Sequence, residues 1–130
     1  MLSRECLEEL RSAWLPHITD CGLDRLVDML DKGSPLLISG CFTKSIPMGC
    51  LASHIAWNHP ETAEHTIDAG ITWLHRVAGL NPATSKVLRE WDLRGGGADL
   101  GLCRALLAEM RREQSARRHV TEVIGCLIEA

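Results

Sequence analysis

The sequence predicts an all-α protein, a compact single-domain bundle of about six or seven short helices over residues 1–130. Three observations support this fold class. Apolar residues recur at the three- and four-residue spacing of helices along most of the chain. Convincing alternating strands are absent, and proline or glycine stands where one helix would end and the next begin.

The composition is typical of a soluble globular protein. Hydrophobic residues make up 45% of the chain and charged residues 24%, and the formal net charge of −3 does not favour a protein that coats nucleic acid or anionic lipid. No apolar run approaches the roughly 18 residues that cross a bilayer. Charged side chains also interrupt the first ten residues, so no signal peptide is expected. These features predict a cytoplasmic protein with reduced thiols and no membrane partner.

The first half of the chain predicts three helices. The first has Ser3 as its N-cap and ends at Pro16, and its apolar stripe consists of Leu2, Cys6, Leu10 and Trp14. The second runs from about Asp20 to Gly33, with a stripe of Leu23, Leu26, Val27 and Leu30. The stretch 34–49 fits either a helix start or an extended segment. Pro47 is expected to begin the third helix, which Asn58, His59 and Pro60 end.

The second half predicts a helix over 61–78, capped by Gly79, in which Leu74 faces inward and Trp73 lies at the edge of the apolar stripe. Its other inward positions are Ile67, Ile71 and Val77 or Ala78. The next helix is expected to start at Asn81 and Pro82 and to end at the glycines 95–97. The final segment starts near Asp99, and its charged interval 111–119 is either a break or the exposed part of one long helix. Its apolar positions are Leu100, Cys103, Leu106, Leu107, Met110, Val120, Val123, Ile124 and Leu127.

Cysteines and histidines are concentrated between residues 41 and 65, where two of six cysteines and three of six histidines lie. On a helix that begins at Pro47, Cys50 and His54 would be i, i+4 neighbours. Cys41 could supply a second sulfur, and His59 or His65 a nitrogen. Thiolate and imidazole together suit tetrahedral Zn²⁺. The sequence therefore predicts a zinc site formed by Cys41, Cys50, His54 and His59.

The same residues allow two other interpretations. Cys50 beside His54 could be held as a thiolate, a nucleophile or a redox sensor. Alternatively, the cysteines are small core residues and the histidines only form hydrogen bonds. No phosphate-binding glycine loop and no serine nucleophile motif is present, so no catalytic residue is assigned and the sequence does not decide whether the protein is an enzyme.

One segment suggests DNA binding. Residues 76–89 read Arg-Val-Ala-Gly-Leu-Asn-Pro-Ala-Thr-Ser-Lys-Val-Leu-Arg, and this resembles the turn and recognition helix of lac-repressor-type helix-turn-helix proteins. The resemblance covers about 14 residues and implies that Thr84, Ser85, Lys86 and Arg89 enter the major groove. An apolar residue is usual in that family where Ser85 stands.

Three functions follow from these patterns. The first is a small helical protein that binds a metal ion through the Cys/His cluster in a structural or sensory role. The second is a DNA-binding regulator that uses the helix after Pro82. The third is a helical interaction or oligomerisation module without catalysis. Trp73 at the edge of its stripe and Trp57 near a helix end would leave apolar surface exposed for a homo-oligomer.

Overall fold

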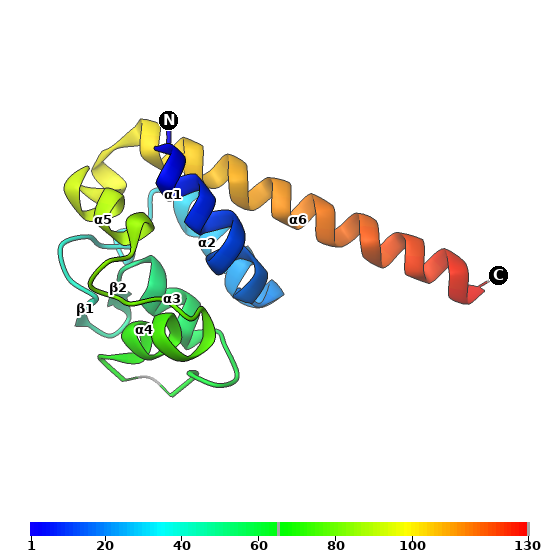
Figure 1. Cartoon of the computed structure of the whole chain (residues 1–130), viewed down its shortest axis with the longest axis horizontal. Helices are drawn as coiled ribbons and strands as arrows, with labels where there is room; N and C mark the ends of the chain where they lie inside the picture. The colour runs from blue at the N-terminus through cyan, green and yellow to red at the C-terminus, as the bar shows by residue number, and fades with distance from the viewer. Residues whose placement is uncertain (65, 130) are drawn as a thin grey trace.

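The computed structural model describes residues 1–64 and 66–129, with side chains described up to Gly125. Helices dominate the described chain, which confirms the all-α fold class, and they gather at one end of a long C-terminal helix (Figure 1). The elements in chain order are α1 (Arg4–Glu9), the π-helical turn η1 (Leu10–Trp14), the 3₁₀ turn η2 (Leu15–His17), α2 (Asp20–Lys32), β1 (Thr43–Ser45), β2 (Met48–Gly49), α3 (Leu51–Trp57), α4 (Ala69–Thr72), the π-helical turn η3 (Trp73–Val77), α5 (Lys86–Leu93), the 3₁₀ turn η4 (Gly96–Ala98) and α6 (Leu100–Glu129). Among these elements, no helix combines the length and hydropathy that crossing a membrane requires.

The first two helices begin and end close to where their local signals predict. Ser3 is the N-cap of α1, and its Oγ accepts a hydrogen bond from the Cys6 amide at 3.2 Å. Thr19 caps α2 in the same way, and Gly33 ends that helix in the left-handed conformation that glycine favours, with φ of 64°. The predicted stripes are confirmed as core, with most of their members buried and Leu2 and Val27 partly buried.

The stretch 34–49 ends in a short antiparallel hairpin of β1 and β2, over residues 43–49. The prediction that Pro47 begins a helix is therefore wrong. Pro47 lies in the hairpin turn, after a cis peptide bond to Ile46, and α3 begins at Leu51 with Cys50 as its N-cap. A proline with its fixed φ suits a turn as well as the first turn of a helix, and the local sequence does not distinguish the two. All residues of α3, from Leu51 to Trp57, are buried, which makes it the central helix.

The predicted helix over 61–78 is also wrong in its first half. The chain after α3 turns back on it, because the Thr62 hydroxyl donates to the Ala56 carbonyl at 2.8 Å and the Trp57 indole donates to the Thr66 carbonyl at 3.2 Å. Helix α4 starts only at Ala69, and Ile67 and Ile71 are exposed rather than inward-facing.

Trp73 is fully buried, not at the edge of its helix. It shares the core with its neighbour Leu74 because η3 is a wider π-helical turn, in which the Ala78 amide bonds to the Trp73 carbonyl at 3.0 Å. The Trp73 ring meets the Trp14 ring edge-on, with 5.4 Å between centroids. This contact joins η1 to η3 within the core.

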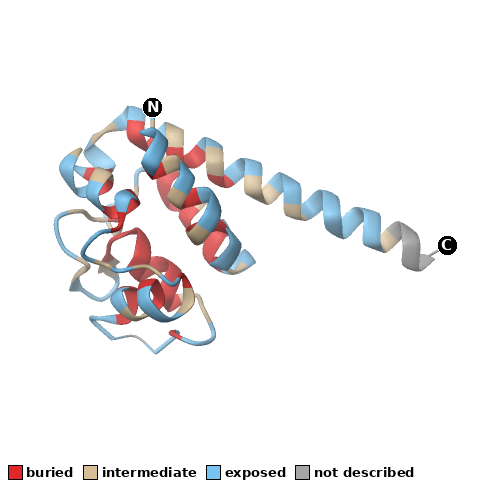
Figure 2. Ribbon diagram, viewed as in Figure 1, coloured by how far each residue is buried: buried red, intermediate tan, exposed pale blue. Residues whose placement is uncertain are grey.

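The charged interval 111–119 is part of one continuous helix, α6, which settles the alternative left open by the sequence. Helix α2 runs antiparallel to the first part of α6. Two ion pairs fix this order, Arg111 with Asp31 at 3.2 Å and Arg117 with Asp20 at 2.9 Å. Beyond this contact α6 extends away from the body, and the residues there are mainly exposed (Figure 2).

Candidate functional site

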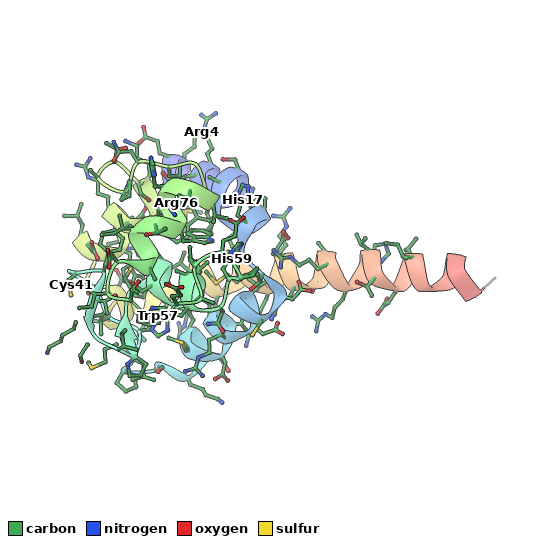
Figure 3. The ribbon with its side chains drawn as sticks, turned by 90° about the horizontal axis from the view of Figure 1, so that it is seen from below. Arg4, His17, Cys41, Trp57, His59 and Arg76 are labelled. Atoms are coloured by element: carbon green, nitrogen blue, oxygen red, sulfur yellow. The ribbon has the colours of Figure 1, made fainter. Side chains whose placement is uncertain are left out.

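The four predicted zinc ligands lie in different surroundings. Cys41 is exposed in the loop before β1, and Cys50 is buried at the start of α3. His54 is buried within α3, and His59 is half-buried after its end. Cys41 and His59 stand well apart on the body (Figure 3). In residues 1–64 and 66–125 no group of three or more His, Cys, Asp or Glu side chains is placed to hold a metal ion. The zinc site stays a prediction, and His65 lies outside the described residues.

Cys50 is buried, and its thiol contacts the side chain of Ser53. Its Sγ is 3.8 Å from the hydroxyl of Ser53, which also contacts the Phe42 carbonyl at 2.7 Å and the Thr43 hydroxyl at 3.0 Å. Burial raises the pKa of the Cys50 thiol to about 11. The thiol is therefore protonated at neutral pH, which argues against the interpretation of Cys50 as an activated nucleophile.

His54 connects α3 to the loop before the hairpin. Its Nε2 lies 2.8 Å from the carbonyl oxygen of Leu36 and donates the hydrogen of that bond, because a carbonyl can only accept. The ring also stands edge-on to Trp57 with 5.1 Å between centroids. Burial lowers the pKa of His54 below its usual value, so the imidazole is neutral at pH 7. These contacts give His54 a structural role in the conformation described.

Cys41 and Cys50 nevertheless line the same small hollow, of about 120 Å³, together with Asp92 of α5. The Asp92 carboxylate accepts a hydrogen bond from the Gly40 amide at 2.9 Å. Two of the four predicted ligands, Cys41 and Cys50, therefore border one hollow.

The segment that resembles a helix-turn-helix has a different start from the predicted one. Residues 81–84 form a turn, and α5 begins at Lys86 with Ser85 as its N-cap, so Pro82 is not the first helical residue. Thr84, Lys86 and Arg89 are exposed, whereas Ser85 is buried. Lys86 Nζ lies 3.9 Å from a Glu5 carboxylate oxygen, so DNA would compete with Glu5 for this cation. The buried Ser85 is not available to a partner.

A carboxylate occupies the N-terminus of α5. Glu9 accepts hydrogen bonds from the Ser85 hydroxyl at 2.7 Å and from the amides of Lys86 and Val87 at 2.9 and 3.0 Å. It also accepts from the Trp14 indole at 3.0 Å. A helix N-terminus is a common place for phosphate to bind. Here Glu9 satisfies the donors that a nucleic-acid phosphate would need.

The second half of α6 carries exposed apolar side chains. Arg117 is its last residue bonded to the body, through Asp20 and the Leu15 carbonyl; in the described chain no hydrogen bond or ion pair joins the body to a later residue of the helix. We call the rest, residues 118–129, the arm. Three branched apolar side chains on the arm, Val120, Val123 and Ile124, are 55%, 46% and 50% exposed. We call these three residues the arm stripe.

The arm stripe continues a face of α6 that is buried nearer its start. Leu102 and Val120 are eighteen residues apart, as are Leu106 and Ile124, and eighteen residues make five turns of an α-helix. Leu102 and Leu106 are each 1% exposed. The same face is therefore covered by the body at one end of α6 and uncovered at the other. The repeat was present in the sequence, but the point at which the body stops covering it was not.

A groove of about 450 Å³ lies between α2 and α6 where the arm leaves the body. Its lining includes Asp20 and Asp24 of α2 and Gln114 and Arg117 of α6. These groups pair across it, Arg117 with Asp20 at 2.9 Å and Gln114 with Asp24 at 2.7 Å. Arg118, Thr121 and Glu122 also line the groove, so it lies between the start of α2 and the first turns of the arm.

Comparison with known proteins finds no matching family model, no matching curated protein and no matching solved structure.

Proposed function

We propose that this chain is a helical interaction module and that the arm is its docking element. The observation that carries the proposal is the arm stripe, which lies on the face of Leu102 and Leu106 but has no cover. Amphipathic helices dock through apolar residues at i, i+3 and i+4, and Val120, Val123 and Ile124 have this spacing.

The energetics favour a partner for the arm. Covering a half-exposed valine or isoleucine contributes about 1 kcal/mol, since full burial of such a side chain is worth about 1.5–3 kcal/mol. The arm continues α6, so the part of the helix packed on the body has already nucleated its turns. A partner helix on the arm stripe would remove apolar surface from water and stabilise the arm at the same time.

The test compares the wild type with a Val120→Glu, Ile124→Glu variant at low protein concentration. A solvent-sensitive apolar dye should bind the wild type more strongly, because the variant loses the apolar surface. Ser115→Glu is the control for added negative charge. It adds one of the variant's two charges, at an exposed position of α6 that lies about 140° around the helix from Val120 and about 180° from Ile124. Equal dye binding by wild type and variant, with arm amides exchanging as fast as in an unfolded peptide, would contradict the proposal.

Zinc binding through Cys41, Cys50, His54 and His59 is a second proposal. The observation that favours it is the hollow shared by Cys41 and Cys50. In the described conformation His54 donates to Leu36 and His59 stands apart from Cys41, so zinc binding would require these side chains to rearrange.

DNA binding is a third proposal, supported by the exposed cations Lys86 and Arg89 on α5. These two side chains would have to bind DNA by themselves, because Glu9 already occupies the amide donors at the N-terminus of α5. Both this proposal and zinc binding are tested below.

A further inference from the structure

We infer that a cavity between α2, the loop 34–39 and the turn η4 binds a small neutral molecule that has an apolar body and a hydrogen-bond acceptor. The cavity has a volume of about 380 Å³, which lies within the range of sites for small ligands. Its lining residues lie outside the arm, so this inference is independent of the proposed function.

The inner wall of the cavity is apolar. It is lined by Met29 and Leu30 of α2, Leu37 of the loop and Cys103 of α6, each of them 9% exposed or less. Among the described residues that line the cavity, none is an aspartate, glutamate, lysine or arginine. Gly33, which ends α2, also borders it, so the carbonyl end of that helix lies beside the cavity. An ion would lose its hydration here without gaining an opposite charge, and an anion would also face the negative end of the helix dipole. The lining therefore selects a neutral ligand.

The two walls of the cavity are held in place by contacts within the protein. In the loop wall, the Ile38 amide donates to the Gly49 carbonyl at 2.9 Å, and the Ile38 carbonyl accepts from the Trp91 indole at 2.8 Å. In the wall formed by η4, Arg94 and Asp99 pair at 2.8 Å across the turn. A preformed cavity binds a ligand without the cost of ordering its walls.

The glycines 95–97 leave room for a ligand. A Cβ at Gly96 would lie 2.7 Å from the Cβ of Ser39, so the two walls meet beside the cavity. Gly97 differs, because the nearest atom that a Cβ there would meet is the Leu37 carbonyl oxygen, at 3.9 Å. Gly97 and Leu37 both line the cavity. A larger side chain at position 97 would therefore occupy the space of the ligand.

Two hydroxyls supply polar contacts to the ligand. Ser34 and Ser39 both line the cavity. The Ser34 oxygen accepts a hydrogen bond from the Leu36 amide at 3.2 Å, and neither hydroxyl donates a hydrogen bond to another residue of the described chain. The hydroxyl hydrogens are thus available to a carbonyl or hydroxyl oxygen. This requirement assigns the acceptor on the ligand.

Titration of the full chain with 2-acetylnaphthalene, a neutral two-ring ketone, tests the inference. Two-dimensional amide NMR should give a Kd of about 0.1–1 mM, with shifts concentrated in residues 34–39 and 95–98. Naphthalene-2-carboxylate, in which a carboxylate replaces the acetyl group, should bind at least about tenfold more weakly. The Val120→Glu, Ile124→Glu variant should bind the ketone like the wild type, which separates the cavity from the arm stripe.

Two variants locate the ligand. Gly97→Leu should abolish binding because it fills the cavity, and Gly101→Leu is the matched control at an exposed position of α6 outside the lining. Ser39→Ala keeps the Cβ beside Gly96 and removes only a hydroxyl, so it should weaken binding about three- to tenfold. Circular dichroism checks that each variant is folded, and Ser39→Ala decides the test should Gly97→Leu not fold.

Several outcomes would overturn the inference. These are the absence of amide shifts at about 1 mM ketone, shifts confined to the arm, and equal binding of the carboxylate. Unchanged binding by a folded Gly97→Leu, or by Ser39→Ala, would overturn it as well.

Discussion

Glu9 and Ser85 lie 76 residues apart in the sequence and are joined by a hydrogen bond of 2.7 Å, which fixes the end of α1 to the start of α5. A second contact joins the opposite ends, because Glu90 accepts from the hydroxyl of Ser3 at 2.8 Å. Each helix thus contributes a glutamate to the N-cap region of the other. The Glu9 contact explains why α5 begins at Lys86, because the Glu9 carboxylate accepts hydrogen bonds from the Lys86 and Val87 amides.

Replacing Glu9 by alanine should lower the free energy of unfolding by about 2–3 kcal/mol, because it removes a cap and a charged acceptor from partly buried donors. Urea denaturation measures the loss. Glu8→Ala is the control, since Glu8 is exposed and pairs only with Arg4 one turn away, so its removal should cost less than about 0.5 kcal/mol. Equal losses in the two variants would show that Glu9 is not the cap described here.

Gly70 allows α4 to approach α3 closely. A Cβ at this position would lie 2.8 Å from the backbone nitrogen of Ser53, which cannot move without shifting α3. Gly70→Ala should therefore destabilise the protein by about 1–3 kcal/mol in thermal or urea unfolding. Gly101→Ala is the matched control on exposed α6, where the nearest atom is at 3.4 Å, and it should stabilise by about 0.5–1 kcal/mol. A neutral Gly70→Ala would contradict the close packing of the two helices.

The buried thiols make stability fall at alkaline pH. Burial raises the pKa of Cys50 from 9.0 to about 11, and burial with a hydrogen bond to Glu90 raises that of Cys6 to about 12. Below about pH 9 both thiols are protonated in the folded and unfolded states. Between about pH 9 and 11 the unfolded chain releases these protons first, so each thiol should lower the free energy of unfolding by about 1 kcal/mol from pH 8 to pH 10.

Urea denaturation at pH 8 and pH 10 measures this effect. The decrease should be smaller in Cys50→Ala than in the wild type. It should be unchanged in Cys21→Ala, where the replaced thiol is exposed. An unchanged decrease in Cys50→Ala would show that Cys50 ionises as readily in the folded protein as in the unfolded chain.

The zinc proposal predicts about one equivalent of metal in untagged protein purified under reducing conditions without chelator. Elemental analysis by mass spectrometry measures it, and Cys50→Ser should release the metal because it removes a thiolate ligand. Cys21→Ser, at an exposed cysteine outside the predicted ligand set, should retain it. A folded protein without metal would end this proposal.

The DNA proposal predicts that replacing Lys86 and Arg89 by alanine weakens binding to duplex DNA and makes it less dependent on salt. The slope of log affinity against log salt should fall by about one for each phosphate that the variant no longer neutralises. Fluorescence anisotropy with labelled duplexes at several salt concentrations measures both effects. Lys32→Ala with Arg4→Ala removes two exposed cations elsewhere and should leave binding unchanged. Equal effects of the two pairs would indicate attraction to overall charge only.

The parts of the fold that sequence predicted depend on local signals. Ser3 before α1 and Gly33 after α2 act through bonds within a few residues, and both helices begin and end close to where these residues indicate. Residues 61–68 contain comparable local signals, but Thr62 and Thr66 bond instead to α3. These hydrogen bonds form only when the segment packs against the folded α3. The local sequence of residues 61–68 therefore could not predict them.

In the candidate sites, too, the spacing of residues was predictable from the sequence, whereas their exposure and hydrogen-bond partners were not. The apolar repeat of the arm was readable from the sequence, whereas its exposure depends on where the body ends against α6, at Arg117. The positions Cys50 and His54 do lie one turn apart, as predicted, with the His54 amide bonded to the Cys50 carbonyl at 3.2 Å. Their side chains nevertheless have separate partners, Ser53 and Leu36, because burial selects hydrogen bonds that sequence spacing alone cannot rank.

Because α6 is one continuous helix, the direction of the arm stripe is fixed relative to the body. One residue inserted between Met110 and Arg117 would rotate the arm stripe by about 100° relative to the face that holds Leu102 and Leu106. Four inserted residues would add about 400°, which returns the stripe to within about 40° of its original direction but about 6 Å further out. The number of residues in this helix, rather than any single contact, thus sets the direction in which a partner is held.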